Sequence, residues 1–339
     1  MNESKSTSLW GNVRRWLPGV VISVVTLFLV FNLASWKDLQ SAFSAIQPLN
    51  LAIAVVISGV SMLVRGVAWR SLLSNKPSIK TSFFTISEGY LLNNIFPLRA
   101  GEIGRAVFMG KAIKVSPFHI LSSIIIERAF DLIVAASLLL STLPLALGLD
   151  WARPVGLATL VLMFVLFATL YLMARYSDRV HAIAEKIGGR WGLFNRLVLP
   201  QIDSLLDGLS ALTNLRQFLL SMFWLGFTWV FWLSVYYVML LAIAPQAPLW
   251  WALFADSLLA LGLAIPSAPA GLGVYEGTMV VALTILGIAR PTALAYAIVV
   301  HFISFAVSGI FGLWGLLRER QSLSTLFSDI QIQRSTPSE

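Results

Sequence analysis

The chain has 339 residues, of which 58% are hydrophobic and 12% are charged. Soluble proteins draw about a quarter of their residues from Asp, Glu, Lys and Arg, so this composition excludes an ordinary soluble enzyme and indicates an integral membrane protein. The net charge of +8 fits basic cytoplasmic loops, and we expect no nucleic-acid partner. With no cysteine and three scattered histidines, we expect no metal and no cofactor.

Six apolar segments are long enough to cross a bilayer as helices, at about 1.5 Å per residue. They cover residues 17–36, 49–69, 118–147, 153–174, 217–243 and 292–317. The first follows a basic start and is longer than the apolar core of a usual signal peptide, so we interpret it as a retained anchor. The pattern predicts an all-α polytopic membrane protein.

Two further apolar stretches are interrupted by polar, proline and glycine residues. The first, 81–114, is broken at Asn93, Asn94, Pro97, Gly101 and Gly104. The second, 249–288, is broken at Pro266, Pro269, Gly271, Gly273 and Gly277. If the second stretch crossed twice, its last part, 278–288, would be only 11 residues, too short for a bilayer. We therefore predict two re-entrant hairpins beside the six spans, or six to eight spans depending on how they are counted.

The distribution of basic residues predicts the topology. With six crossings, 19 of the 24 Lys and Arg residues fall on one face, three fall on the other and two lie within helices. Basic loops stay in the cytoplasm, so we expect a multi-pass protein of the bacterial cytoplasmic membrane with both termini cytoplasmic.

The two interrupted stretches enter from opposite sides and are similar in sequence. Pro97 is followed by Ala-Gly and an acidic residue at 100–102, and Pro269 is followed by Ala-Gly and then by Glu276. Paired interrupted segments in two halves indicate an inverted-repeat transporter with its site at the midplane. The alternative is that Pro/Gly loops join short helices. The expected hinge and backbone positions are Pro97, Gly101, Pro266, Pro269, Gly271 and Gly273.

The chain is accordingly divided into five parts. Residues 1–16 form a cytoplasmic N-terminus, 17–174 the first transmembrane half, 175–216 a cytoplasmic surface connection, 217–320 the second half and 321–339 a disordered tail. In the connection, helical pieces are expected near 178–187 and 200–212, along the anionic membrane surface.

Charged residues inside the first half mark a candidate site, because burying them in a bilayer is costly. Glu127, Arg128 and Asp131 occupy neighbouring helix positions. Arg128 is expected to face a cavity and meet an anionic substrate while the acids hold it, and the alternative is a structural ion network. Arg65 is expected to extend to the cytoplasmic interface, or alternatively to join Arg99 and Arg105 around the first broken stretch.

Guanidinium groups beside glycine-rich backbone suit a phosphate. Arg99 and Arg105 are therefore candidate phosphate ligands. In the second half, Glu276 and, after it, Asp256 are candidates for cation or proton coupling, or for contact with a cationic headgroup. For His301 we expect hydrogen-bonded packing. A row of glycines at positions 309, 312 and 315 predicts a close helix-packing face.

Three ordered motifs carry a resemblance to a known family. They are EGYLLNNIFPLRAGEIGR at 88–105, IERAFD at 126–131 and PSAPAGLGVYEG at 266–277. Together they resemble the lysylphosphatidylglycerol synthase transmembrane-region family, the flippase-like domain of the multiple peptide resistance factors. The resemblance spans roughly residues 15–320 and implies movement of a lipid with a charged or glycosylated headgroup. The chain stops soon after its last helix, so we expect a stand-alone form without the synthase domain.

We therefore expect a flippase-like transporter of a phospholipid or a polyprenyl-phosphate-linked headgroup, and no enzyme activity. The lipid phosphate would meet Arg99, Arg105 or Arg128. The cationic or sugar part would meet Glu276 with Asn93, Asn94 and Tyr275. One alternative is an accessory subunit of a separately encoded glycosyltransferase or lipid synthase, which would then be a partner, and another is a membrane lipid phosphatase. The chain can also form oligomers.

Overall fold

The structure is a computed structural model. It describes residues 36–44, 46–96, 99–148, 152–188, 213–264 and 268–319, together with the single residues Phe28, Leu199, Ile202 and Leu206. All regular elements in these ranges are helices. They are α2 (Trp36–Ser44), α3 (Pro48–Leu72), α4 (Ile79–Ile95), α5 (Ala100–Ile113), α6 (Pro117–Leu147), α7 (Ala152–Arg175), α8 (Ser177–Gly188), α11 (Leu215–Ile243), α12 (Leu249–Gly262), the 3-10 turn η2 (Pro269–Gly271), α13 (Val274–Ile285) and α14 (Arg290–Glu319).

Four of these helices, α3, α6, α11 and α14, are long and apolar enough to cross a membrane. The prediction of an all-α membrane protein is confirmed at this level. Five of the six predicted apolar segments coincide with a helix. Four of them are the helices just named, and the other is α7, which packs beside α6. The first segment, 17–36, and the tail after 320 lie outside the described residues. Of the predicted surface helices, 178–187 is α8, and most of 200–212 also lies outside them.

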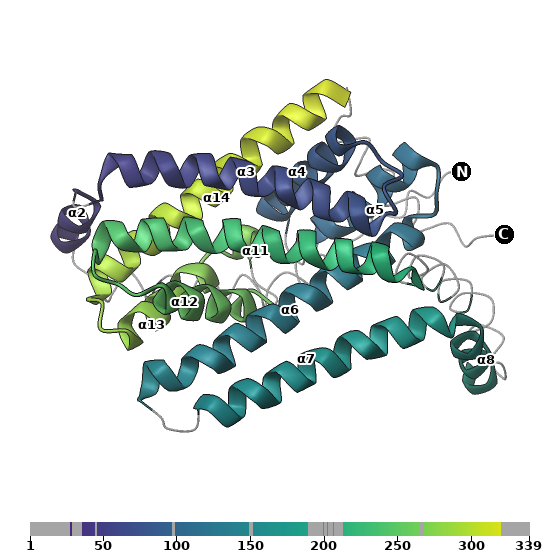
Figure 1. Ribbon diagram of the computed structural model, residues 1–339. Coiled ribbons are helices and arrows are strands. Elements are labelled where there is room, and N and C mark those ends of the chain that lie inside the picture. Colours follow the sequence, from purple (N-terminus) through teal and green to yellow (C-terminus); the bar gives the residue numbers. More distant parts are fainter. Residues whose placement is uncertain are drawn as a thin grey trace, which may run out of the picture.

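The centre of the bundle is a long antiparallel pair, α3 and α11, which lie side by side in Figure 1. The amide of Asn50, early in α3, donates to the carbonyl oxygen of Val238, late in α11, at 2.9 Å. At the other end, the hydroxyls of Ser71 and Ser221 are 2.9 Å apart. Side-chain hydrogen bonds of this kind join membrane helices where apolar burial alone gives little preference.

The first interrupted stretch folds as the helical hairpin α4–α5. The two helices touch at glycines: a Cβ built on Gly101 would lie 1.8 Å from the carbonyl oxygen of Gly89. Only glycine permits that approach. The second stretch folds as the hairpin α12–α13, where a Cβ on Gly262 would lie 2.7 Å from Oγ1 of Thr278.

The helix breaks differ in place from those expected. Asn93 and Asn94 lie inside α4, and Gly101 and Gly104 lie inside α5, so none of the four interrupts a helix. Helix α4 ends at Ile95 and α5 begins at Ala100, and just before α5 Arg99 adopts a left-handed conformation with a φ of 53°. Gly101 lies within α5 and makes a close backbone contact with Gly89, and its role as a hinge stays a prediction. Gly277 lies within α13, while Pro97 and Pro266 are outside the described residues.

The two hairpins pack reciprocally on the long helices of the opposite half. Helix α4 packs on α14, and α12 packs on α6. In Figure 1, α5 lies at the same end of the bundle as α8, whereas α12 and α13 lie toward the end that carries α2. Their turns meet in the middle, where Nη2 of Arg99 donates to the carbonyl oxygen of Leu263 at 2.9 Å. The architecture thereby brings the connections of the two hairpins together in the middle of the bundle.

The predicted glycine face of α14 holds in part. A Cβ on Gly312 would lie 2.5 Å from the carbonyl oxygen of Ser87, and one on Gly315 would lie 2.6 Å from Oε1 of Glu88. Both glycines therefore permit the close approach of α4. Gly309 differs, because a Cβ there would meet no atom within 4 Å.

Candidate functional site

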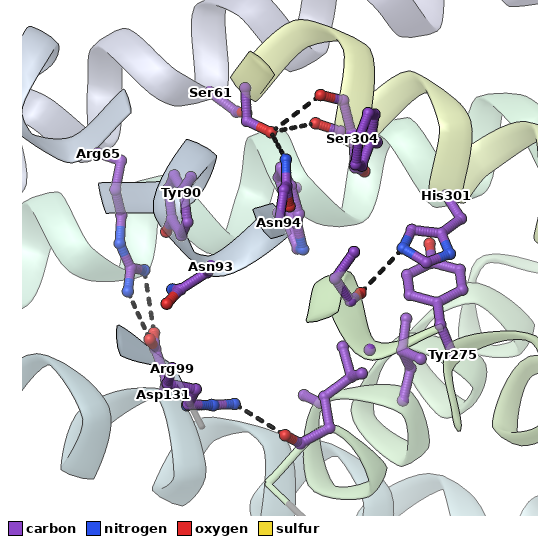
Figure 2. Close-up of a pocket in the computed structure, with 18 of the residues that line it drawn as sticks. Ser61, Arg65, Tyr90, Asn93, Asn94, Arg99, Asp131, Tyr275, His301 and Ser304 are labelled. Carbon is purple, nitrogen blue, oxygen red and sulfur yellow. Dashed lines mark hydrogen bonds and ion pairs between the residues drawn. The ribbon is translucent and has the colours of Figure 1, made fainter. Parts of the chain in front are cut away.

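A cavity of about 570 Å³ lies between the two hairpin turns and the long helices. This volume is within the ordinary range for ligand sites, about 300–1,000 Å³. Polar side chains from eight helices of both halves line it, and Figure 2 shows several of them. The charged and larger polar side chains that line it are Arg65, Tyr90, Asn93, Asn94, Arg99, Glu102, Arg128, Asp131, Tyr236, Asp256, Tyr275 and His301.

One buried carboxylate organises the cationic side of the cavity. Glu127 on α6 is fully buried and accepts from three guanidinium groups. Nη2 of Arg65 lies 2.6 Å from Oε1, and Nη2 of Arg128 lies 2.7 Å from the same oxygen. Arg105 binds both oxygens, with distances of 3.1 and 2.8 Å. A buried charge is tolerated only when it is paired and hydrogen-bonded, and Glu127 meets that condition.

Asp131, one helical turn further along α6, extends this network to the cavity wall. It accepts from Nη1 of Arg65 and from the indole Nε1 of Trp229, each at 3.0 Å. Nη1 of Arg128 lies 3.3 Å from its other oxygen. The network therefore joins α3, α6 and α11, and Figure 2 shows the guanidinium of Arg65 directed at Asp131.

The predicted phosphate ligand Arg105 does not reach the cavity. Its side chain is 1% exposed, its two Nη atoms are occupied by Glu127, and its guanidinium lies 4.2 Å from the ring centroid of Trp69. Neither Arg105 nor Glu127 is among the lining residues. Both residues therefore lie behind the cavity wall. An arginine buried to this degree needs a carboxylate partner within the protein, and Glu127 is that partner.

Arg65 also differs from its leading interpretation. It does not extend to the interface: its side chain is 9% exposed and ion-paired with Glu127 and Asp131. These partners lie 62 and 66 residues away in the chain, so no local pattern could reveal them.

Two arginines remain available to a ligand. The side chain of Arg128 is 25% exposed and that of Arg99 is 43% exposed, and both line the cavity. Each is restrained by Glu102, whose Oε1 lies 3.3 Å from Nε of Arg128 and 3.4 Å from Nη1 of Arg99. Counting the whole cluster, four guanidinium groups (65, 99, 105, 128) face three carboxylates (102, 127, 131), a net charge of +1. This side of the cavity favours an anion.

Asn93 and Asn94 project from α4 and line the same space. Oδ1 of Asn93 accepts from the backbone N–H of Gly101 at 2.8 Å, which fixes the start of α5. Nδ2 of Asn94 donates to the hydroxyl of Ser308 on α14 at 3.0 Å. Each amide therefore has one group committed to the fold and presents the rest of its surface to the cavity.

The second hairpin contributes a histidine–carboxylate pair. Nδ1 of His301 on α14 lies 2.6 Å from Oε1 of Glu276 on α13, and its Nε2 lies 3.1 Å from the carbonyl oxygen of Ala270. The ring of Tyr275 stacks on the imidazole, with centroids 4.0 Å apart and an interplanar angle of 12°. His301 and Tyr275 line the cavity, whereas Glu276 is buried behind them.

The turn of that hairpin has an unusual backbone. Ala270, Gly271 and Gly273 have φ angles of 58°, 75° and 83°. Gly271 and Gly273, which were predicted as hinge or backbone positions, adopt these positive φ angles without strain because glycine has no Cβ. Pro269 begins η2, and the N–H of Gly273 donates to Oε2 of Glu276 at 2.7 Å.

Within the described part of the chain, no group of three or more acidic, histidine or cysteine side chains could hold a metal ion. The remaining acid of the cavity is Asp256 on α12, which is 2% exposed. Its Oδ2 accepts no hydrogen bond from the described residues. His301, for which the sequence predicted hydrogen-bonded packing, makes such contacts and also lines the cavity. Tyr90 and Glu102 line the cavity too, although sequence reasoning did not single them out.

Comparison with known proteins adds independent information. A family model described as the lysylphosphatidylglycerol synthase TM region matches residues 16–312. A UPF0104 membrane protein of Methanothermobacter thermautotrophicus is 24% identical over 344 residues, which cover 92% of this chain and 97% of that protein. Glycosyltransferase AglD of Haloferax volcanii is 27% identical over 352 residues, which cover 91% of this chain and 55% of that protein.

The match to the family model includes α3 to α13, most of α14 and thus both hairpins and the cavity between them. It also includes the three sequence motifs on which the resemblance rested. The chain belongs to the family of lysylphosphatidylglycerol synthase transmembrane regions.

Proposed function

We propose that the protein translocates an anionic lipid, a phospholipid or a polyprenyl-phosphate lipid, by passing the headgroup through the central cavity. The observation that carries this proposal is the cationic wall at the meeting point of the two hairpins, where Arg99 and Arg128 are partly exposed to the cavity. Arginine forks bind phosphate oxygens bidentately. The intramembrane position calls for a ligand that also has an apolar part.

An apolar groove next to the cavity suits the acyl or prenyl chains of such a lipid. It has a volume of about 730 Å³ and lies between α3, α4 and α14. Its wall is almost entirely aliphatic and aromatic, and Val307 lines both the groove and the cavity. A lipid can therefore keep its chains in an apolar setting while its headgroup lies in the polar cavity.

The order and packing of the helices support an inverted repeat. The series α3, α4–α5, α6 corresponds to α11, α12–α13, α14 in order and in approximate length. The packing of α4 on α14 is matched by that of α12 on α6, and α3 pairs antiparallel with α11. Rocking of two such halves alternates access to a site at the bilayer midplane. The Arg99–Leu263 hydrogen bond would then open and close with that motion.

The basic residues of the described chain suggest the orientation in the membrane. The end formed by α5 and α8 carries Lys111, Lys114, Arg179 and Lys186. Following the positive-inside rule, we place this end in the cytoplasm of the cell membrane, together with both termini.

We propose no enzymatic step in this cavity. Its side chains can bind, orient and release a headgroup. Release of phosphate from a polyprenyl diphosphate by the purified protein would favour the phosphatase alternative instead.

The test measures translocation of a fluorescent phosphatidylglycerol in proteoliposomes. The quantity measured over time is the fraction of the fluorescent lipid that an impermeant quencher reaches. Translocation is expected to be faster in vesicles that contain the wild-type protein than in protein-free vesicles. The variant Arg128→Gln is expected to slow translocation about tenfold, which corresponds to a loss of about 1.4 kcal/mol of phosphate binding. The matched control Arg179→Gln, on exposed α8, should retain the wild-type rate. Equal rates in all three proteins would refute the role of the cavity.

A second candidate function is that of an accessory subunit for a glycosyltransferase or lipid synthase. The observation that favours it is that one relative, of which this chain matches 55%, is named a glycosyltransferase. An accessory role predicts that the chain copurifies with such an enzyme and raises its activity while fluorescent phosphatidylglycerol stays in its original leaflet.

A further inference from the structure

His301 lies between two hydrogen-bond acceptors on the second hairpin. One is the carbonyl oxygen of Ala270, 3.1 Å from Nε2, and the other is Oε1 of Glu276, 2.6 Å from Nδ1. From this geometry we infer that His301 and Glu276 form a proton-binding site, which couples proton movement to the lipid translocation proposed above. The inference rests on that proposed function for its role, but the proton site itself stands on the hydrogen-bond geometry.

The protonation of the pair follows from the chemistry of the acceptors. A carbonyl oxygen can only accept, so Nε2 of His301 must carry a hydrogen. A contact of 2.6 Å between Nδ1 and a carboxylate oxygen also needs a hydrogen between the two atoms. The pair therefore holds one proton more than a neutral imidazole beside an ionised carboxylate. Whether that proton sits on Nδ1 or on Oε1, the pair has no net charge.

Loss of that proton would break one of the two contacts. A neutral imidazole has a single N–H, so it can donate to Ala270 or to Glu276 but not to both. At the other contact, the lone pair of an imidazole nitrogen would then face a lone pair of the acceptor oxygen. At buried positions such an unsatisfied contact is costly, so the deprotonated pair favours a different arrangement of the hairpin turn.

The turn held by this pair is part of the cavity wall. Glu276 accepts from the N–H of Gly273 at 2.7 Å, and His301 holds the carbonyl of Ala270. Ala270 has a φ of 58°, which is unfavourable for a residue with a Cβ. A strained turn persists only while its surroundings hold it. Because Ala270 and Gly271 line the cavity, releasing the pair would move the wall next to the bound headgroup.

Among the described residues, no Lys or Arg contacts the pair in place of the proton. The titratable groups around it are the hydroxyls of Tyr275 on α13, Tyr236 on α11 and Tyr296 on α14, and the carboxyl group of Asp256 on α12. Tyr275 stacks on the imidazole and its hydroxyl lies 3.1 Å from that of Tyr236, while Tyr296 donates to the carbonyl of Tyr236. The chain has no Lys or Arg between Arg216 and Arg290. Across the cavity, the guanidinium of Arg99 donates to the carbonyl oxygen of Leu263.

Coupling also has a simple electrostatic reason. A lipid with one phosphodiester carries one negative charge, and moving it with one proton makes the step electrically neutral. The proton would be taken from water on one side, held between Nδ1 and Oε1, and released to water on the other side when the turn reopens. His301 lines the cavity, so the pair has a route to the water that enters there.

Nitrogen NMR of the full chain in lipid nanodiscs tests the proton site without assuming transport. The chain has three histidines, and the signals of His301 are identified by their loss in His301→Gln. In the wild type, both ring nitrogens of His301 should show a bound or shared proton. In Glu276→Gln, one nitrogen should show the shift of a bare lone pair. A bare lone pair in the wild type would overturn the inference.

A pH gradient across proteoliposomes tests the coupling. With one proton per lipid, a gradient of one pH unit should shift the steady-state leaflet ratio of fluorescent phosphatidylglycerol by up to about tenfold. The shift should reverse with the gradient, vanish in His301→Gln and Glu276→Gln, and persist in the control His181→Gln on α8. Translocation with a leaflet ratio that does not change with the pH gradient would overturn coupling and leave the proposed function intact. Absence of all translocation would overturn the proposed function and the coupling together, and NMR would still decide the proton site.

Discussion

Arg99 at the first hairpin turn donates a hydrogen bond of 2.9 Å to the carbonyl oxygen of Leu263 at the end of α12. The two residues are 164 positions apart in the chain and belong to hairpins that come from opposite ends of the bundle (Figure 1). This bond joins two residues that line the cavity. Under the proposed function, Arg99 has two roles that compete for one guanidinium: it bridges the turns, and it would bind the lipid phosphate.

Replacing Arg99 by glutamine should impair lipid translocation with little loss of stability. The side chain is 43% exposed, so its hydrogen bond and ion pair contribute at most about 1 kcal/mol to folding. Translocation of fluorescent phosphatidylglycerol should fall about tenfold, for a loss of about 1.4 kcal/mol of phosphate binding. Thermal unfolding in detergent and the proteoliposome rate are the two measurements. A large loss of stability with normal translocation would assign Arg99 a structural role only.

Glu127→Gln should destabilise the protein severely. Three guanidinium groups share this carboxylate in the bundle interior, and removing one member of a buried ion cluster costs about 3–5 kcal/mol. The control is Glu102→Gln, because Glu102 is 21% exposed and its contacts are longer, at 3.3 and 3.4 Å. Thermal unfolding in detergent should show a much larger loss for Glu127→Gln. Equal losses for both variants would contradict the central position of Glu127.

Arg105→Lys should lower stability without weakening phosphate binding in the cavity. Lysine keeps the charge but loses the bidentate contact with Glu127 and the stacking on Trp69. We expect a loss of about 1–3 kcal/mol in unfolding free energy. The affinity of the folded variant for phosphatidylglycerol should stay within about twofold of wild type, because Arg105 lies behind the cavity wall. A tenfold weaker affinity at full stability would place Arg105 in the binding site after all.

A pair of glycine substitutions tests the packing of the first hairpin. Gly101→Ala places a Cβ 1.8 Å from the carbonyl oxygen of Gly89, so the helices must separate, at a cost of about 1–3 kcal/mol or more. Gly309→Ala meets nothing within 4 Å and should stabilise α14 by up to about 1 kcal/mol through helix propensity. Thermal unfolding of both variants decides the point. A stabilising Gly101→Ala would contradict the close contact of α4 and α5.

The sequence was sufficient to predict the long helices and the presence of two interrupted segments, because apolar length and Pro/Gly breaks are local signals. The positions of the breaks were less accessible. Asn93 and Asn94 stay helical since their side chains bond to Gly101 and Ser308, and a sequence pattern does not contain such tertiary partners.

The candidate site was predictable in the same partial way. Arg128 and Asp131 were found because charges are rare inside apolar helices. The partners of Arg65 and His301 could not be deduced, since each pairs with a residue on another helix that is distant in the chain. For Arg105 the residue type suggested a phosphate ligand, and its complete burial against Glu127 and Trp69 decides against direct contact with the cavity.

The most direct test of the central claim is whether the cavity itself binds an anionic headgroup. The chain contains no cysteine, so Asn94→Cys places a single thiol in the cavity wall, and Asp178→Cys on exposed α8 serves as the control. The rate of modification by a small water-soluble thiol reagent is compared in nanodiscs with and without phosphatidylglycerol. We predict that phosphatidylglycerol slows modification at position 94 several-fold and leaves position 178 unchanged, and that adding Arg128→Gln removes this protection. Equal modification of position 94 in both membranes would contradict the account.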